Sequence, residues 1–298
     1  MPPVSNARIV SFLPSATEMV YALGLESQLV AVSHECDFPP DARAKPAVVR
    51  PALELAALGP SEIDDAVVRQ LRSGESMYAV DETLLRSLAP DIILTQDLCQ
   101  VCAPSGNETT RVVASLASHP DVLYFTPRVL ADVWSDLRAL GDATGTRERA
   151  ESVIADGERR LADVSRRVSR SATRPRVFFA EWVDPIYCAG HWVPEMIEIA
   201  GGFDRLGRAG ADSVRVAWSD VVAAAPEVII VGPCGYSADA AAEQMKFLTT
   251  REGWTDLPAV RANRVFPVDA NAFFARPGPR LVEGVEILAR LLHPQLFA

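Results

Sequence analysis

The sequence has little positive charge and no long apolar run. Its 298 residues include 29 Lys and Arg against 39 Asp and Glu, which gives a formal net charge of −10. A chain without a basic surplus cannot neutralise phosphates, so nucleic acid and anionic membrane surfaces are excluded as partners. No stretch approaches the ~20 consecutive apolar residues that a membrane span requires. Small ligands or basic protein surfaces are the partners that this composition favours.

The sequence also lacks a secretory signal at its N-terminus. Between Arg8 and Pro14 the apolar stretch is only five residues long, whereas a signal peptide contains roughly 7 to 15 apolar residues. We therefore expect a cytoplasmic protein if the sequence is read as it stands. If a leader has been removed, the expected location is periplasmic or otherwise extracytoplasmic.

The motifs of several large enzyme classes are missing. The sequence contains no glycine-rich dinucleotide fingerprint, no phosphate-binding loop, no nucleophile elbow and no His-Glu-x-x-His zinc helix. It therefore predicts a protein without catalytic activity. A less favoured alternative is an enzyme that uses one of the five cysteines as a nucleophile.

Short strand-like runs alternate with helical segments along most of the chain. This alternation is typical of α/β proteins in which mostly parallel sheets are flanked by helices. A stretch without strand character, 130–170, separates an earlier group of runs from a later one, which predicts two sheets. The predicted strands are 8–12, 29–33, 91–95 and 122–126 in the first group and 176–180, 227–231 and 264–268 in the second.

The separating stretch has the pattern of one long helix. After Gly145 and the candidate N-cap Thr146, apolar or small residues recur every three or four positions from Ala150 to Val168. This spacing predicts an amphipathic helix of ~25 residues. We expect a rigid backbone helix that joins two lobes, although a surface helix on one large sheet would show the same spacing. The predicted domains are an N-terminal lobe, 1–127, a helical connector, 128–172, and a C-terminal lobe, 173–298.

Polar and aromatic residues gather after the predicted strands. In open parallel sheets, ligands bind beyond the carboxyl ends of the strands, so residues at these positions are candidates for a ligand site. If the two lobes face each other across these ends, several histidines and cysteines would share one cleft. They are His34, Cys36, Cys99, Cys102, Cys188 and His191.

The helix expected after the first strand begins near Ser15. Ser15 or Thr17 would cap this helix, and Glu18 would interact favourably with the positive end of its dipole. Alternatively, backbone N–H groups at the same N-terminus would bind amides or carboxylates of a ligand. The positions of these residues fit both interpretations.

Two of the cysteines, Cys99 and Cys102, have the spacing of a metal-binding pair. Together with Cys36 and a histidine they would complete a tetrahedral site for zinc or iron. The same residues would also fit a redox dithiol, or thiols that are buried as small apolar groups. Either His34 or His191 would also fit as an axial ligand of a corrinoid cobalt. Alternatively, each of these histidines lies in a loop and only forms hydrogen bonds there.

Seven segments, taken in order, resemble a known family. They are 8–24, 30–40, 88–94, 184–190, 201–203, 225–231 and 273–280. These segments are similar to the cobalamin-binding substrate-binding proteins of ABC transporters, which belong with the siderophore binders in the helical-backbone metal receptor superfamily. The resemblance spans nearly the whole chain, and the ordered set is more specific than any one segment.

The resemblance implies a two-lobed protein that holds a cobalamin, a related corrinoid or another metal chelate in the interlobe cleft. A flat macrocycle needs aromatic and apolar walls and a few polar groups at its rim. Each candidate aromatic residue, taken alone, would also be explained by packing in the hydrophobic core instead of contact with a ligand. The predicted ligand residues are Ser15, Glu35, Tyr78, Gln96, Trp182, Tyr187, Trp192, Phe273, Phe274 and Arg276.

The resemblance also implies an ABC permease as a partner. Family members present one carboxylate on each lobe to arginines of the permease. Asp220 matches the C-terminal position, whereas the N-terminal position is Thr83, with Asp81 and Glu82 beside it. We therefore expect Asp220 and Glu82 to be the docking residues, and a solvated acidic face is the alternative at both positions.

Overall fold

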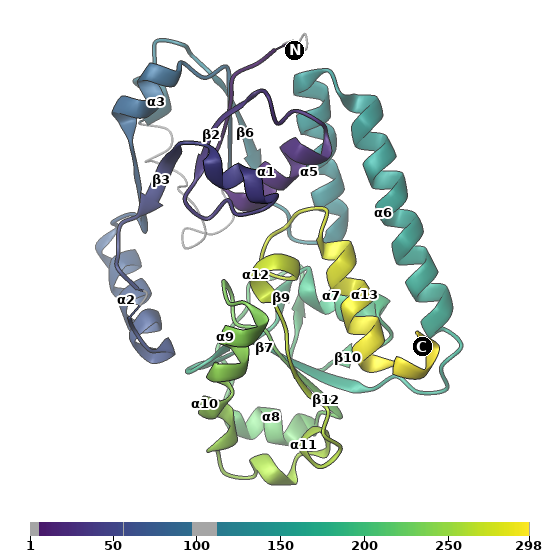
Figure 1. The fold of residues 1–298 in the computed structure, drawn as a ribbon. Coiled ribbons are helices and arrows are strands. Elements are labelled where there is room, and N and C mark those ends of the chain that lie inside the picture. Colours follow the sequence, from purple (N-terminus) through teal and green to yellow (C-terminus); the bar gives the residue numbers. More distant parts are fainter. Residues whose placement is uncertain (1–5, 56, 97–111, 298) are drawn as a thin grey trace. The chain divides into compact units, whose positions relative to one another are not determined.

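The structure, a computed structural model, describes residues 6–55, 57–96 and 112–297. The chain falls into two compact units. The N-terminal unit comprises Met1–Pro127 and Ala131–Ala155, and the C-terminal unit comprises Arg128–Leu130 and Asp156–Ala298. Each unit is built on a central sheet with helices around it (Figure 1).

The N-terminal unit contains a six-stranded sheet with the strand order β4-β3-β2-β1-β5-β6. Neighbouring strands are parallel except β3 and β4, which are antiparallel. The strands are β1 (Ile9–Ser11), β2 (Leu29–Ser33), β3 (Ala47–Pro51), β4 (Tyr78–Val80), β5 (Ile92–Gln96) and β6 (Asp121–Phe125). The helices are α1 (Pro14–Ala22), η1 (Pro40–Ala44), α2 (Pro60–Ser73), α3 (Glu82–Leu88) and α5 (Leu130–Thr144).

The C-terminal unit contains a sheet with the order β10-β7-β12-β13, with β8 antiparallel to β7, and a separate two-stranded ribbon of β9 and β11. The strands are β7 (Arg176–Val183), β8 (Ile186–Cys188), β9 (Gly190–His191), β10 (Phe203–Asp204), β11 (Arg208–Ala209), β12 (Val228–Val231) and β13 (Val265–Pro267). The helices are α7 (Val193–Ile199), α8 (Trp218–Ala224), α9 (Ala238–Gln244), α10 (Lys246–Thr249), η2 (Trp254–Asp256), α11 (Pro258–Arg261), α12 (Ala270–Phe273), α13 (Leu281–Leu292) and η3 (Pro294–Leu296).

All seven predicted strands are present, as β1, β2, β5, β6, β7, β12 and β13. The prediction of an α/β protein with two mostly parallel sheets is confirmed, and each of the two sheets contains one antiparallel pair, β3 with β4 and β7 with β8. The prediction missed β3, β4 and β8 to β11. Most of these strands are only two or three residues long, so their sequences are too short to show a period.

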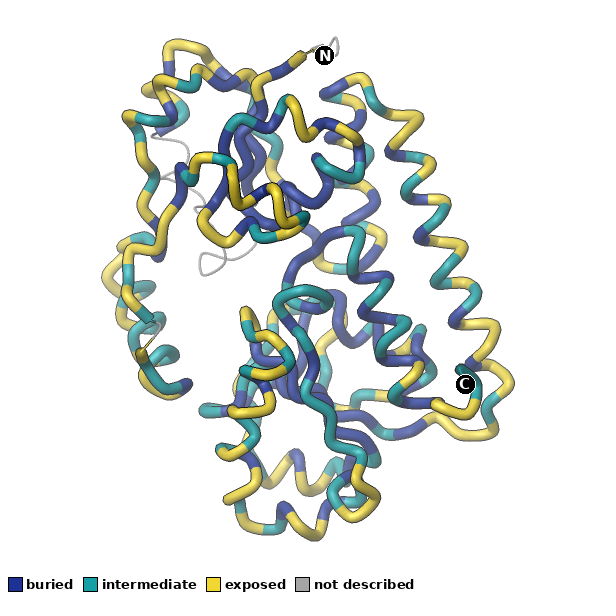
Figure 2. Tube along the Cα trace, viewed as in Figure 1, coloured by how far each residue is buried: buried dark blue, intermediate teal, exposed yellow. Residues whose placement is uncertain are grey.

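The long predicted helix is α6 (Arg147–Val168), with 22 residues. Its N-terminus follows Thr146 directly, as the sequence indicated. Along the helix, Ala150, Ile154 and Val164 of the apolar stripe are buried, with exposures between 0% and 4%. The residues between them are mostly half-buried or exposed (Figure 2), so one face of α6 is apolar and the other meets solvent.

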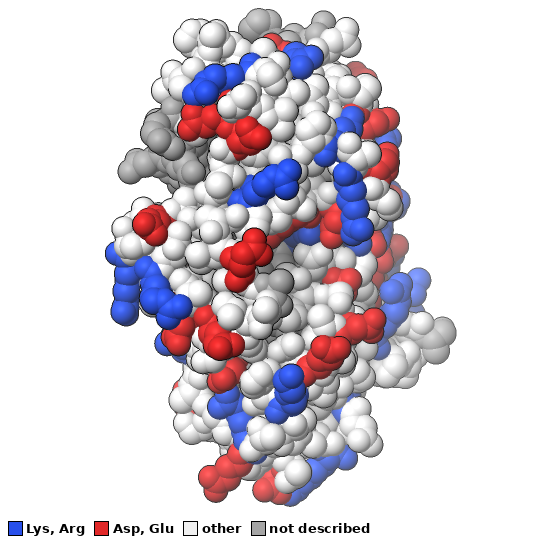
Figure 3. All heavy atoms as spheres, turned by 60° about the vertical axis from the view of Figure 1, so that its left-hand side comes forward, with Lys and Arg blue, Asp and Glu red and all other residues white. Residues whose placement is uncertain are grey.

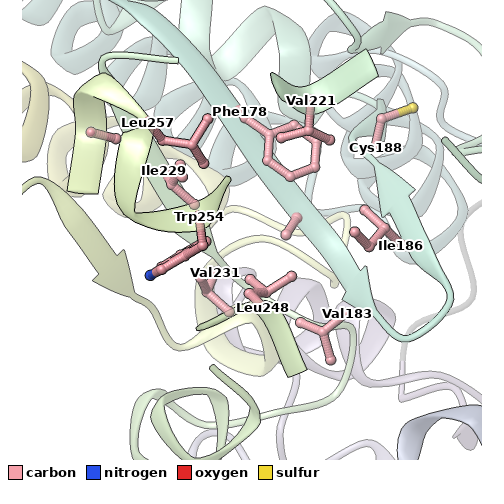
Figure 4. Packing of buried hydrophobic residues seen from close by; sticks show 12 residues of the cluster. Phe178, Val183, Ile186, Cys188, Val221, Ile229, Val231, Leu248, Trp254 and Leu257 are labelled. Atoms are coloured by element: carbon pink, nitrogen blue, oxygen red, sulfur yellow. The ribbon is translucent and has the colours of Figure 1, made fainter. Parts of the chain in front are cut away.

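The core of the C-terminal unit surrounds β7 and β12. All four residues of β12 are at most 1% exposed, which is typical of a parallel strand covered on both faces. Figure 4 shows side chains of β7, β8 and β12 packed against Val221, Leu248 and Trp254 from the surrounding helices. Cys188 belongs to this cluster, and burial raises the pKa of its thiol.

Among the residues that the structure describes, no helix combines the length and the apolar character needed to cross a membrane.

Close packing at Gly284 of α13 gives a first prediction. A Cβ atom there would lie against the backbone carbonyl oxygen of Phe273 and 2.6 Å from Cε of Met196. We expect Gly284→Ala to lower the free energy of unfolding by about 2 kcal/mol, because α12 would have to move away from α13. Urea unfolding measures the change. Arg290→Ala, at an exposed position of the same helix, is the control, and equal stabilities of the two variants would show that the packing is looser than described.

Candidate functional site

Four side chains form a row beside the carboxyl end of β7. Trp182 on β7 lies opposite Tyr187 on β8, and Tyr187 is paired in turn with Arg215 through an isolated antiparallel bridge. On the other side, the rings of Trp182 and Tyr236 meet edge to face with their centroids 5.6 Å apart. We call these four residues, Tyr236, Trp182, Tyr187 and Arg215, the aromatic row.

The β7–β8 hairpin explains why the first two rings share a face. Directly opposed residues of an antiparallel pair project to the same side, and the next pair projects to the other side. The next pair here is Val183 and Ile186, which are 0% and 3% exposed and belong to the core. Trp182 and Tyr187 therefore project away from that core. The indole Nε1 of Trp182 donates a hydrogen bond to the Asp184 carbonyl at 3.2 Å, which fixes its orientation.

Arg215 is held against the end of the row. Its Nε donates to the hydroxyl of Tyr187 at 3.0 Å, and its guanidinium carbon lies 5.8 Å from the centroid of the Tyr187 ring. Both contacts orient the plane of the guanidinium. An exposed arginine is thus placed in one geometry relative to an aromatic surface.

A second aromatic and cationic pair follows β13. The backbone N–H of Asn271 donates to the Tyr236 carbonyl at 3.1 Å, which ties the start of α12 to the aromatic row. Phe273 lies at the end of α12, and the guanidinium carbon of Arg280 is 4.6 Å from the centroid of its ring. Arg276, between them in sequence, is only 9% exposed.

Two of the predicted ligand residues serve the core of the C-terminal unit. Trp192 is 6% exposed and donates its indole N–H to the Phe274 carbonyl at 2.7 Å. Phe274 is 2% exposed, and its ring lies 5.4 Å from that of Phe179. The structure gives both residues a packing role, whereas Trp182 and Tyr187 are only half-buried.

His191 lies on the β9–β11 ribbon in the left-handed region, with φ +50°. Its Nε2 is 3.1 Å from Oδ1 of Asp212. The preceding residue, Gly190, donates its backbone N–H to Glu181 at 3.0 Å. Burial raises the pKa of the Glu181 carboxyl, and hydrogen bonds from Gly190 and Ser213 together with the nearby His191 counteract that rise.

Asp204, the last residue of β10, is a second acid that accepts backbone hydrogen bonds. Its Oδ1 accepts backbone hydrogen bonds from Leu206 and Gly207, both at 2.9 Å. Burial raises its pKa from the ordinary value of 3.8 to about 6, and the backbone hydrogen bonds only partly offset this effect. A turn built on a buried carboxyl group therefore follows β10.

In the N-terminal unit, the structure brings His34 and Tyr78 together. Their ring centroids are 6.0 Å apart. Nδ1 of His34 lies 3.2 Å from the Val49 carbonyl, and Nε2 lies 3.8 Å from a carboxylate oxygen of Glu35. Donation to the carbonyl requires the proton on Nδ1, which in neutral imidazole leaves Nε2 as the nitrogen able to bind a metal.

Cys36 is 2% exposed, and its Sγ accepts a hydrogen bond from the Thr17 hydroxyl at 3.1 Å. Cys99 and Cys102 lie outside the described residues. Within 6–55, 57–96 and 112–297, no group of three or more His, Cys, Asp or Glu side chains could hold a metal ion. The metal site built from Cys36, Cys99, Cys102 and a histidine stays a prediction.

The predicted cap of α1 is wrong. Leu13 is the N-cap, Pro14 occupies the first turn, and no side chain caps the helix. Thr17 instead donates to Cys36 on the neighbouring strand end, because it is buried within the helix rather than at its start. Ser15 is 2% exposed in the first turn, and Gln96, at the carboxyl end of β5, is 4% exposed.

The two predicted docking carboxylates differ in their surroundings. Glu82 lies in the first turn of α3 and forms a 2.6 Å ion pair with Arg86 one turn later. Asp81 caps the same helix by accepting a hydrogen bond from the Leu84 backbone at 2.9 Å. Asp220 lies in the first turn of α8 and is exposed.

The sequence analysis missed Tyr236, Arg215 and Arg280. Tyr236 follows the predicted strand 227–231 by five residues, so a search of every strand end would have found it. Arg280 closes a segment that carried the family resemblance. Arg215 has no such signal, because its bridge to Tyr187 joins residues 28 apart in the sequence.

Aromatic and cationic side chains at the carboxyl end of a strand make this edge of the C-terminal sheet a candidate ligand-binding surface. Comparison with known proteins agrees. Residues 9–272 match the model of the periplasmic binding protein family, so the chain belongs to that family. Its members are non-enzymatic substrate-binding proteins of ABC transporters, and the chain is such a substrate-binding protein.

Three similar proteins illustrate the range of the family. An uncharacterised ABC transporter substrate-binding lipoprotein, YvrC of Bacillus subtilis, is 25% identical over 97% of this chain and 81% of its own length. A vitamin B12-binding protein of Vibrio cholerae is 26% identical over 95% of this chain and 88% of its own. The solved structure of the periplasmic heme-binding protein BhuT with two hemes has a TM-score of 0.72 at 22% identity, covering 97% of this chain and 99% of its own.

We expect Asp204→Asn to reduce the pH dependence of stability. An acid with a higher pKa in the folded protein than in the unfolded chain binds its proton preferentially when folded. Its contribution to the free energy of unfolding is therefore greatest below pH 3.8 and declines as the pH rises through about 6. Between about pH 4 and pH 7 the wild type should lose roughly 2 kcal/mol more than the variant.

Urea unfolding at several pH values measures this difference. Asp256→Asn is the control, because Asp256 is exposed and paired with Arg261. If the wild type and Asp204→Asn showed the same pH profile, the buried carboxyl group would not be the cause.

Proposed function

We propose that the protein binds a flat metal chelate, a cobalamin-like corrinoid or a related macrocycle, and presents it to an ABC transporter. The observation that carries this proposal is the aromatic row at the carboxyl end of β7. Its rings come from three segments, β7, β8 and the loop after β12. The Trp182 ring meets the Tyr236 ring edge to face, and Arg215 lies against Tyr187 at the other end of the row.

The chemistry of such a ligand fits the row. A macrocycle offers a large flat π-system with polar substituents only at its rim, and aromatic side chains contribute large contact areas at a small cost in conformational entropy. Rings that are held by hydrogen bonds need not be ordered upon binding, so less affinity is lost. Trp182 and Tyr187 are both held in this way.

The relatives support the same class of ligand. Their names record binding of vitamin B12 by the Vibrio cholerae protein and of heme by BhuT. Both compounds are metal-containing macrocycles. We therefore keep the residues predicted from the resemblance as candidate ligand residues of each unit taken by itself. They are Ser15, Glu35, Tyr78 and Gln96 in the N-terminal unit and Phe273 and Arg276 in the C-terminal unit.

We expect the Trp182→Ala variant to bind the macrocycle at least tenfold more weakly than the wild type, because it removes the central ring of the row. A tenfold change in affinity corresponds to about 1.4 kcal/mol of binding free energy. Calorimetric titration with cyanocobalamin, hydroxocobalamin and hemin measures the affinity. Trp218→Ala is the matched control, because Trp218 also contacts another aromatic ring, that of Trp254 at 6.2 Å, but lies outside the row.

Thermal melts of both variants confirm that they are folded. The absence of binding of any of the three compounds to the wild type would contradict the proposed function. Equal affinities of Trp182→Ala and Trp218→Ala would contradict the assignment of the row.

The proposal includes docking on an ABC permease through Asp220 and Glu82. We expect Asp220→Arg to weaken the association with the cognate permease by tenfold or more, because a charge reversal places like charges opposite each other. Asp256→Arg is the control, since Asp256 is another exposed acid of the C-terminal unit. Pull-down of the permease in lipid nanodiscs measures the association, and equal recovery by both variants would exclude Asp220.

A further inference from the structure

One arginine connects the β7–β8 turn with the helix that carries Asp220. Arg251 lies between α10 and η2, and its Nη2 donates to Oδ1 of Asp184 at 3.1 Å. Asp184 belongs to the β7–β8 turn, and its backbone carbonyl accepts the indole N–H of Trp182 at 3.2 Å. The residue that orients the central ring of the aromatic row is therefore also bound to Arg251.

The guanidinium group of Arg251 also contacts Trp218, the first residue of α8. Its carbon atom lies 5.9 Å from the centroid of the Trp218 ring. Trp218 is held in turn, because its indole N–H donates to the Glu252 carbonyl at 2.7 Å and its ring stacks on that of Trp254. Asp220, the proposed docking residue, follows in the first turn of the same helix. Arg251 therefore contacts both the turn next to the proposed ligand surface and the proposed docking helix.

The segments that Arg251 joins are anchored in one core. Val183 ends β7 next to the turn, Val221 lies on α8, and Leu248 precedes Arg251 by three residues. All three are buried in the cluster shown in Figure 4. Side chains in a close-packed interior leave little room for independent shifts. A displacement of the turn is therefore passed on through Arg251 to α8 rather than taken up by loose packing.

The geometry at Arg251 differs from that of an exposed ion pair. Acidic and basic side chains are interspersed over the face seen in Figure 3, and pairs between exposed groups contribute little to stability. The side chains of Arg251 and Asp184 are 28% and 37% exposed. Besides Asp184, the Arg251 guanidinium donates to the carbonyls of Phe247 at 3.1 Å and Val183 at 3.4 Å. Three acceptors fix the plane of the group, so it contacts Trp218 in one orientation.

We infer that Arg251 is a positioning residue that couples ligand binding on the aromatic row to the docking helix α8. This inference rests on the proposed function and adds to it a route between its two surfaces. A ligand that covers Trp182 restricts the indole and, through it, the turn at Asp184. Arg251 and Trp218 are then ordered with the turn, so the start of α8 opens less often. The permease would meet a docking helix whose mobility depends on whether ligand is bound.

Hydrogen exchange of the α8 amides tests this coupling without the permease. The wild type is measured empty and saturated with cyanocobalamin, and again with hemin, after calorimetric titration has given each affinity. We expect ligand to slow exchange in peptides that cover 218–224 by about threefold or more, because an ordered helix opens less often. Arg251→Gln, saturated with the same compound, should show no slowing in these peptides.

Two further variants probe the same connection. Asp184→Ala removes the carboxylate but keeps the backbone carbonyl that accepts the Trp182 indole, so it should abolish the slowing as Arg251→Gln does. Combining the two changes should have no additional effect on exchange, because both break one connection. Arg251→Lys keeps a charge for Asp184 but lacks the planar group, and we expect it to recover part of the slowing. If Arg251→Gln does not fold, Asp184→Ala decides the question.

Arg264→Gln is the matched control. Arg264 is another half-buried arginine of the C-terminal unit, and its guanidinium donates to the carbonyls of Leu291 and Leu292 at 3.1 and 2.9 Å. This variant loses comparable hydrogen bonds but keeps those of Asp184 and Trp218, so it should retain the full slowing. Urea unfolding of the variants measures how far each is destabilised.

Slowing that persists unchanged in Arg251→Gln would overturn this inference, and so would a wild type that binds a compound without any change in α8 exchange. Equal loss of the slowing in Arg264→Gln would overturn it as well, because general loosening would then explain the effect. In each of these cases calorimetry still detects binding, so the proposed function stands. If the wild type bound neither cyanocobalamin, hydroxocobalamin nor hemin, the proposed function would fail and this inference with it.

Discussion

Burial of parallel strands on both faces is the constraint on which the rest of this structure depends. All four residues of β12 are at most 1% exposed, and Val10 and Ile93 in the N-terminal sheet are completely buried. A polar side chain in such a strand needs a hydrogen-bond partner, as Ser11 has in the Leu13 carbonyl, because it would otherwise cost free energy. The candidate ligand residues Trp182 and Tyr187 lie instead near the end of β7 and on the short strand β8. The β8 strand pairs with the last residues of β7 and turns Trp182 and Tyr187 away from the core.

The same constraint explains two half-buried acids of the C-terminal unit, Glu181 and Asp204. Where the chain leaves the sheet and forms the β9–β11 ribbon, backbone N–H groups need partners that no neighbouring strand supplies. Glu181 accepts the N–H of Gly190, and Asp204 accepts those of Leu206 and Gly207. Burial raises the pKa of both acids, so these turns are formed at an electrostatic cost. The hydrogen bond from Gly190 to Glu181 fixes the start of the ribbon beside His191, whose backbone lies in the left-handed region.

The fold alone does not identify the ligand, since one scaffold serves several ligands in this family. A protein whose name records heme binding shares the fold at a TM-score of 0.72, and a relative at 26% identity is named for vitamin B12 binding. Discrimination between such ligands must come from the side chains at the strand ends. In the proposed site, aromatic rings such as those of Trp182 and Tyr187 would accept the face of any macrocycle, so polar side chains at the strand ends would have to distinguish one ligand from another.

The sequence by itself determined the α/β class, seven of the strands, the long helix α6 and two members of the aromatic row, Trp182 and Tyr187. Each of these depends on a local pattern, either an apolar period or the position of a residue just after a strand. Only the tertiary structure decided that Trp192 and Phe274 pack in the core, that Thr17 binds Cys36 instead of capping α1, and that Arg215 completes the row. These outcomes depend on pairing between residues that are 19 to 82 positions apart. The physical reason is that a local pattern fixes the direction of a side chain relative to its own strand or helix, whereas its neighbours are fixed by how the strands pair.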